Sequence, residues 1–328
     1  MKLNLKKENI GFYLSAIFLG IVFGGYRFTN MMSDWVGYEN YITHNYQRPF
    51  VTRALIPYIV EQLHKFNISP EFLFQSFEVI ATILCIIFFE KLLSYFIHNK
   101  FYTQVMANAL IIMAPFLLIL PRLINLWYPY DIFSLLFNIL LIIFLYKENY
   151  LLYYPLFIIA TINRESTFFV TFAMLFIYFK NYTHKKLFLH IAAQFFIWLT
   201  IVKTMDRLLT HEEGYYFEFL LMKNFGFIKD IFTAQGITGG SIGRSVFQVA
   251  SFFHALSFLF ITVIVVQNWK LLDQLFLRRL FFTSIPFYFV VFVRTNAYEY
   301  RLIAEFLPFV FLPGAYVIYQ RIMSAAKN

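Results

Sequence analysis

The chain has 328 residues, of which 60% are hydrophobic, 22% aromatic and 14% charged. An ordinary soluble domain carries about 25% charged residues, so this composition excludes a soluble globular domain. The formal charge of +9 comes from basic residues dispersed between apolar runs, a pattern that excludes a nucleic-acid-binding face and fits contact with membrane lipid.

The apolar runs reach or approach the roughly 20 residues that cross a bilayer core, and they recur along the whole sequence. They predict an all-α fold, a polytopic membrane helix bundle with about ten spans. Because about ten spans leave no room for a sizeable soluble domain, we expect a single transmembrane domain over residues 1–328. The predicted spans cover residues 10–28, 71–89, 104–120, 129–146, 150–162, 165–180, 187–203, 246–267, 280–293 and 300–318.

The first predicted span follows a basic start, MKLNLKK, and shows no small-residue cleavage site, which indicates a retained span. Spans 150–162 and 280–293 are each about 20 Å long, so neither should cross the hydrocarbon without thinning of the bilayer or help from neighbours. Cys85, the single cysteine, lies in the apolar run ATILCIIFFE, so no intrachain disulfide can form and a packing role is expected.

Two long segments, 29–70 and 204–245, are predicted outer loops. In the first, residues 53–66 have the pattern of an amphipathic helix lying at the membrane interface. The second contains an aromatic interfacial stretch and the glycine-rich AQGITGGSIGR, which matches no phosphate-binding motif and favours a flexible loop.

Lysines give the orientation, because most of them lie on the short tails and loops of one side, which the positive-inside rule assigns to the cytoplasm. We therefore expect a multi-pass protein of the cell membrane with both termini cytoplasmic. Lysines also flank both ends of 151–180. This strip is predicted to be a hairpin broken at Asn163-Arg164-Glu165, with its tip near the outer face, in preference to one long tilted helix.

Arginines, in contrast, concentrate on the predicted outer side. A guanidinium binds phosphate through two hydrogen bonds and stays charged when desolvated, so outer arginines predict a pocket for a phosphorylated substrate. A shared water-accessible cavity would hold the ionisable groups of this face most cheaply, and separate structural ion pairs are the alternative. The groups concerned are Asp34, Arg48, Asp131, Arg164, Glu165, Arg294 and Arg301.

The first outer loop offers several candidates. Asp34 is a candidate general base toward an acceptor hydroxyl, with aromatic neighbours such as Trp35 to stack against a sugar, and a solvated loop is the alternative. Arg48 and Arg53 are candidates to hold a lipid phosphate, unless they snorkel to headgroups. Asp131 begins an apolar span, where it either joins the site or caps the helix.

The run Asn163-Arg164-Glu165-Ser166 is the most specific signal in the chain. Adjacent charges between apolar runs are costly unless they are paired or face a cavity. Arg294, Glu299 and Arg301 repeat the theme near the last span. There Arg301 and Glu305 are four residues apart and share a helix face, so a pair between them is the alternative.

Metal and cofactor chemistry finds no support in the sequence. The seven histidines show no ligand spacing with one another or with Cys85, so we expect no dedicated metal site. No nucleotide-binding or nucleophile-elbow motif is present either, and no cofactor is expected.

The layout of a short acidic first outer loop, about ten spans and outer arginines and carboxylates resembles the GT-C class of integral membrane glycosyltransferases, which use polyprenyl-phosphate-linked sugars. The segments Arg48-Pro49-Phe50, Tyr130-Asp131, Asn163-Arg164-Glu165-Ser166 and Glu299-Tyr300-Arg301 also resemble small bacterial multispan proteins found with cell-surface polysaccharide genes. By this resemblance Asp34 matches the first-loop catalytic carboxylate. The chain departs from the many members with a paired acidic motif, because it has only Asp34 and Glu39.

The resemblance implies transfer of a sugar from a polyprenyl phosphate or diphosphate carrier to a glycan or lipid acceptor on the outer membrane face, in polysaccharide biosynthesis of the cell envelope. Asp34 would then be the base. Arg164 and Arg301 would bind the phosphate as its charge grows, and Glu165 would orient Arg164. One alternative is a surface-polysaccharide polymerase or ligase, and another is a transporter or flippase of a lipid-linked sugar, since transporter sites use broken helices.

Overall fold

The computed structural model describes residues 7–29, 38–44, 50–118, 128–209, 222, 259–294 and 301–326. Within these residues every regular element is a helix, which confirms the all-α prediction. The elements up to residue 118 are α1 (Lys7–Thr29), α2 (Tyr38–Ile42), η1 (Phe50–Thr52), α3 (Leu55–His64), α4 (Pro70–Leu93) and α5 (Lys100–Leu118). The remaining ones are α6 (Asp131–Tyr146), α7 (Tyr150–Asn163), η2 (Glu165–Phe169), α8 (Val170–Tyr178), α9 (His184–Leu209), η3 (Trp269–Leu271), α13 (Leu275–Arg294), α14 (Arg301–Glu305) and α15 (Leu307–Ala325), and residues 259–267 are helical as well.

Local sequence signals set several of the helix ends. Pro70 opens α4 with Glu71 in its first turn, where a fixed φ and a negative charge both suit a helix N-terminus. The side chain of Asn149 accepts a hydrogen bond from the backbone N–H of Leu152 at 3.3 Å and caps α7. Between α6 and α7 the chain turns at Glu148, which has a left-handed φ of 52°.

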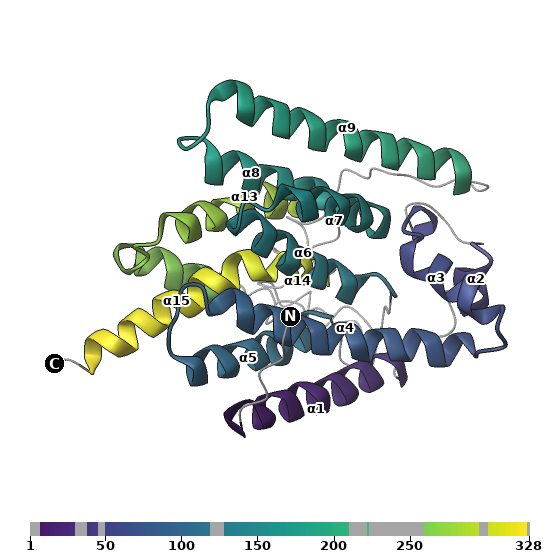
Figure 1. Cartoon of the computed structure of the whole chain (residues 1–328), viewed down its shortest axis with the longest axis horizontal. Coiled ribbons are helices and arrows are strands. Elements are labelled where there is room, and N and C mark those ends of the chain that lie inside the picture. The colour runs from purple at the N-terminus through teal and green to yellow at the C-terminus, as the bar shows by residue number, and fades with distance from the viewer. Residues whose placement is uncertain are drawn as a thin grey trace.

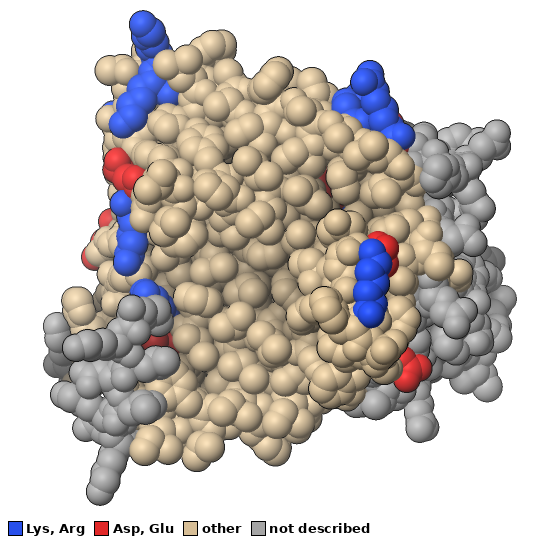
Figure 2. Space-filling view, turned by 45° about the vertical axis from the view of Figure 1, so that its right-hand side comes forward, with Lys and Arg blue, Asp and Glu red and all other residues tan. Residues whose placement is uncertain are grey.

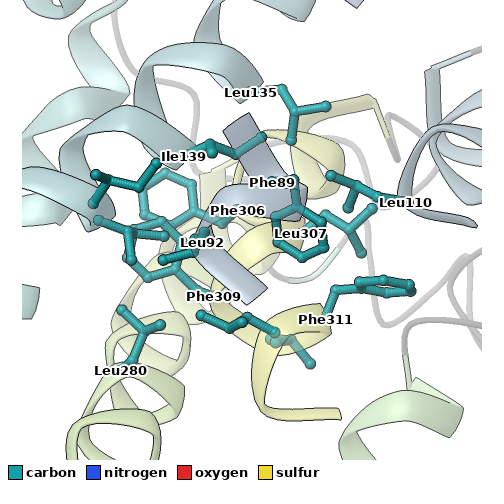
Figure 3. Close-up of a cluster of buried hydrophobic side chains, with 14 of the residues drawn as sticks. Phe89, Leu92, Leu110, Leu135, Ile139, Leu280, Phe306, Leu307, Phe309 and Phe311 are labelled. Atoms are coloured by element: carbon teal, nitrogen blue, oxygen red, sulfur yellow. The ribbon is translucent and has the colours of Figure 1, made fainter. Parts of the chain in front are cut away.

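The core lies where α4, α6 and the α14–α15 segment meet. Figure 3 shows Phe89 of α4, Ile139 of α6 and the rings of Phe306 and Phe309 gathered in this cluster. Phe306 and Phe309 stack with their ring centroids 4.7 Å apart. Because α6 is largely buried in protein, apolar residues occupy most of its circumference, and this explains why its sequence reads like a membrane span.

Small residues allow α1 to pack closely against α4. Ala16, Gly20 and Gly24 recur every fourth residue on one side of α1, the spacing that lets two helix backbones approach within a membrane. A Cβ added at Gly24 would lie 2.9 Å from the backbone nitrogen of Val79, so α4 occupies the place of a side chain there.

The predicted hairpin over 151–180 is present. Arg164 has an extended backbone (φ −163°, ψ 133°) and ends α7, after which η2 and α8 return. The return is complete, because the hydroxyl groups of Tyr150, at the start of α7, and Tyr182, beyond α8, lie 2.5 Å apart.

The hairpin opens at the end of the bundle that lies at the left of Figure 1, and the loops and helix ends there carry many of the described basic residues. There Lys147 lies over the ring of Tyr95, and Arg279 donates to the side chain of Asn181 at 3.2 Å, so separate loops meet at the same end. We call this the basic end. Its described basic residues are Lys91, Lys100, Lys147, Lys180, Lys185, Lys186, Lys270, Arg278, Arg279 and Arg321.

The number of predicted spans is not supported. Among the described residues three helices are both long and apolar enough to cross a membrane: Pro70–Leu93, His184–Leu209 and Leu275–Val293. Residues 129–146 and 150–162 form helices of 16 and 14 residues, which are shorter than a span requires. The expectation that 280–293 is too short to cross a membrane is wrong. The helix there, α13, begins five residues earlier, at Leu275, and has 20 residues.

The surface of the bundle matches an apolar surrounding. Figure 2 shows a broad face of uncharged residues with Lys and Arg at its edges. Large apolar side chains on α1, α9 and α13, such as Phe18, Phe196 and Phe289, are exposed. Such an extent of exposed apolar surface is unusual for a monomer in water and marks contact with lipid or a partner.

Candidate functional site

The candidate site begins with the helix break at Arg164. Breaking a helix frees backbone carbonyl groups, which need new donors when they are buried. The carbonyl oxygen of Arg164 accepts from the Thr167 hydroxyl at 2.9 Å, and that of Glu165 accepts from the indole N–H of Trp198 in α9 at 2.8 Å. The break is therefore stabilised by the fold and turns two adjacent charged side chains to different sides.

Arg164 is enclosed between two carboxylates. Its Nη1 atom lies 2.6 Å from Oδ1 of Asp131, the first residue of α6, and 2.7 Å from Oε1 of Glu305, the last residue of α14. All three side chains are 2% exposed or less. One buried guanidinium thus holds together three segments that are far apart in the sequence.

Glu165 turns the other way and pairs with Arg53, which precedes α3. Its carboxylate accepts from Nε of Arg53 at 3.0 Å and also from Nη2. The Glu165 side chain remains 35% exposed, whereas that of Arg53 is 8% exposed. Within the described part of the site, Glu165 is the charged residue with the most exposed side chain.

Tyr130 connects the two ion pairs. Its hydroxyl accepts from Nη1 of Arg53 at 3.2 Å. The guanidinium carbon atoms of Arg53 and Arg164 lie 5.0 and 5.2 Å from its ring centroid, within the range of cation–π attraction. We call Arg53, Tyr130, Asp131, Arg164, Glu165 and Glu305 the charged cluster.

Further hydrogen bonds hold the charged cluster in place. The Asn163 side chain donates to the carbonyl oxygen of Tyr130 and to the Ser134 hydroxyl, both at 3.0 Å. The Ser166 hydroxyl donates to Oε2 of Glu305 at 2.5 Å, and the Asn138 side chain donates to the Glu305 carbonyl oxygen at 2.8 Å. These bonds fix the side chains of α6, α7 and α14 relative to one another.

The structure brings together five of the predicted site residues: Arg53, Asp131, Asn163, Arg164 and Glu165. The predicted pairing was wrong in detail. Glu165 does not orient Arg164 but bonds Arg53, and Asp131 binds Arg164 through its carboxylate while Tyr130 occupies the N-cap position of α6. Adjacent residues at the helix break project differently, which a prediction from sequence neighbours cannot anticipate.

The other predicted residues cannot be placed in the same way. Asp34, Arg48 and Glu299 lie outside the described residues. Arg294 ends α13 and Arg301 begins α14, and their side chains lie outside the description. The expectation that Arg48, Arg294 and Arg301 share one cavity with Arg164 stays a prediction.

Glu305 is the site residue whose role the sequence did not reveal. The sequence suggests a pair with Arg301, four residues earlier, but the carboxylate contacts Arg164 and Ser166. Its signal was present, because a lone acidic residue within an apolar last span requires a buried partner. Tyr130 and Trp198 carry no such signal in the sequence.

Charge counting limits what the charged cluster does alone. The described cluster contains three carboxylates and two guanidinium groups. Both guanidinium groups are engaged, so the described part does not attract a phosphate strongly. It can instead present one partly exposed carboxylate, that of Glu165, held in a fixed position by Arg53. The described His, Cys, Asp and Glu residues form no group of three or more suited to a metal ion.

Comparison of the chain with protein-family models, curated proteins and solved structures finds no match.

Proposed function

We propose that the protein is an integral membrane glycosyltransferase that moves a sugar from a polyprenyl phosphate or diphosphate carrier to a glycan or lipid acceptor. In this proposal the charged cluster lies near the outer face of the cell membrane, and the basic end faces the cytoplasm together with both termini. The shorter apolar helices complete the bundle of about ten spans around the three long ones.

The observation that carries the proposal is the charged cluster itself. Buried ion pairs are weak contributors to stability, and replacing them by apolar residues is often neutral or favourable. Five charged side chains from segments near residues 53, 131, 164 and 305 nevertheless meet at a broken helix. Charges at such a place in an apolar protein are most often retained for function.

The geometry supports a division of labour within the site. Arg164 acts as a positioning residue, because its guanidinium is already paired with the carboxylates of Asp131 and Glu305. Glu165, held by Arg53 and partly exposed, is the group placed to orient an acceptor. The phosphate is assigned to Arg48, Arg294 and Arg301, and Asp34 keeps the role of general base.

A surface-polysaccharide polymerase or ligase is a second candidate, because it uses the same arginines around a lipid diphosphate without a first-loop base. A flippase of a lipid-linked sugar is a third, and the broken helix at Arg164 favours it. Against a flippase, the backbone carbonyl groups that the break at Arg164 frees are already bonded by Thr167 and Trp198.

The test is the profile of lipid-linked sugars in a host strain that lacks the protein. A transferase predicts accumulation of a lipid-linked monosaccharide on the outer leaflet, restored to normal by the wild-type chain but not by Asp34→Ala. Normal function of Asp34→Ala with longer lipid-linked glycans accumulating in the deletion strain would favour the polymerase. Accumulation on the inner leaflet alone would favour the flippase.

A further inference from the structure

A second group of polar and aromatic side chains lies at the basic end. The charged cluster lies at the start of α6 and this group lies beyond its end, and the 16 residues of α6 span about 24 Å. The second group is formed by Tyr150 and Tyr154 of α7, Tyr182 of the loop after α8, and Lys186 and His190 of α9. We call these five residues the tyrosine patch. The chain that carries it, from Leu145 to Trp198, is described throughout.

The rings of the tyrosine patch pack on one another. The ring centroids of Tyr150 and His190 lie 4.6 Å apart, and Tyr154 stacks on His190 at 6.0 Å. The Tyr154 hydroxyl is 2.6 Å from Nδ1 of His190. This contact fixes the imidazole between α7 and α9.

Lys186 is held over an aromatic face. Its Nζ atom lies 3.7 Å from the ring centroid of Tyr182, in the position of a cation–π contact. The Lys186 side chain is exposed, so the ammonium keeps donors directed to the outside. The contact orders a lysine side chain that would otherwise be mobile.

The Tyr182 ring is itself fixed. Its hydroxyl donates to Oε2 of Glu148 at 2.7 Å and lies 2.5 Å from the Tyr150 hydroxyl. Burial, together with the hydrogen bonds to Tyr150 and Glu148, raises the pKa of Tyr182 above its ordinary value. The phenol therefore stays neutral at physiological pH and adds no negative charge beside Lys186.

The surrounding charges are mainly positive. Lys180 and Lys185 are exposed on either side, Lys147 lies on the α6–α7 turn, and Glu148 is the acidic side chain that contacts the patch. Interfacial tyrosines and lysines are the residues that meet lipid headgroups, and each lysine near an anionic membrane surface contributes about 1 kcal/mol.

We propose that the tyrosine patch binds the phosphate headgroup of an anionic membrane lipid, with Lys186 as the ligand and the packed tyrosine and histidine rings holding Lys186 in place. The apolar flank of α9, with exposed Phe188 and Leu189 beside the patch, receives the acyl chains. This inference concerns the opposite end of the bundle and does not rest on the proposed sugar transfer.

The test measures lipid binding to the purified full chain, delipidated in detergent, by native mass spectrometry with phosphatidylglycerol or phosphatidylcholine added. We expect retained phosphatidylglycerol and about fivefold weaker binding in Lys186→Ala, the factor that about 1 kcal/mol gives. Lys203→Ala is the matched control, because Lys203 is an exposed lysine near the other end of the same helix. Equal binding of the two lipids, or equal losses in both variants, would overturn the proposal.

Two variants of Tyr182 test the role of its ring. Tyr182→Phe keeps the aromatic face under Lys186 and should retain most of the phosphatidylglycerol, whereas Tyr182→Ala should bind as weakly as Lys186→Ala. Loss in both Tyr182 variants, with unfolding temperatures unchanged, would show that the ring does not position Lys186 and would contradict the assignment of the patch.

Discussion

At the scale of single residues, Arg164 carries the largest energetic consequence. A guanidinium that is 2% exposed is tolerable only because two carboxylates neutralise it, and each of those is equally buried. Removing one partner of such a group leaves an uncompensated buried charge, and the cost is about 3 to 5 kcal/mol. This cost exceeds what a substrate-binding residue on an open surface would show.

We therefore predict that Arg164→Ala lowers the stability of the protein by about 3 to 5 kcal/mol and reduces the amount of folded protein. The measurement is the unfolding temperature in detergent. Neutralising the partners as well, in Asp131→Asn/Arg164→Gln/Glu305→Gln, should recover most of the lost stability. A wild-type unfolding temperature for Arg164→Ala would mean that Arg164 is not the centre of an ion-pair network.

Glu165 should behave differently, because its side chain is 35% exposed and its loss leaves Arg53 with Tyr130 as a remaining partner. Glu165→Gln keeps the size of the side chain and an oxygen that accepts from Arg53, so we predict a smaller loss of stability than for Arg164→Ala, together with loss of activity in cells. The two readouts are the unfolding temperature and complementation of a deletion strain. Full complementation would remove Glu165 from the catalytic assignment.

The sequence allowed the meeting of Asp131, Arg164 and Glu165 to be predicted, because apolar surroundings leave charged residues few other places. It did not allow their pairing to be predicted. Arg164 and Glu165 are separated by an abrupt change from helix to extended backbone, so they point to different partners. Glu305 meets Arg164 only through tertiary packing. The two residues are 141 positions apart in the sequence, and no local sequence pattern indicates their contact.

At the scale of secondary-structure elements, the contact between α1 and α4 depends on the absence of side chains at Gly20 and Gly24. Gly24→Ala places a methyl group against the backbone of Val79, which must then move. We predict a loss of about 1 to 3 kcal/mol from overpacking, seen as a lower unfolding temperature.

Gly11→Ala is the matched control on the same helix, since a Cβ there meets nothing within 4 Å. It should be neutral or slightly stabilising, because alanine favours a helix over glycine by up to about 1 kcal/mol. Equal effects of the two substitutions would argue against close packing of α1 on α4.

The same scale explains why the predicted number of spans finds no support among the described helices. Residues 131–146 are mostly apolar because α4, α7 and the α14–α15 segment cover them, and composition alone does not separate such a core helix from a span. The hairpin break was predictable, since polar residues interrupt an apolar strip at 163–165. The start of α13 at Leu275 was not predictable, because Arg278 and Arg279 suggest a loop. In the structure both lie within the helix and donate hydrogen bonds to backbone carbonyl groups of neighbouring segments.

At the scale of the whole molecule, the basic end gives the proposed orientation. In a Cys85→Ala background, Lys185→Cys lies at the basic end and Lys65→Cys near α3, and both positions are exposed. We predict that a membrane-impermeant thiol reagent labels Lys65→Cys in intact cells and Lys185→Cys only after permeabilisation. The opposite pattern would reverse the orientation and place the charged cluster on the cytoplasmic side.

The central claim is that the charged cluster belongs to an enzyme that uses a lipid-linked sugar. Its most direct test is consumption of the lipid-linked sugar that accumulates in a deletion strain, extracted and added to the purified chain in lipid nanodiscs. The account predicts that the wild-type protein transfers the sugar from its carrier to membrane acceptor from the same strain, while Glu165→Gln, folded to the same extent, does not. An unchanged carrier lipid with the wild-type protein, in the presence of membrane acceptor from the same strain, would contradict it.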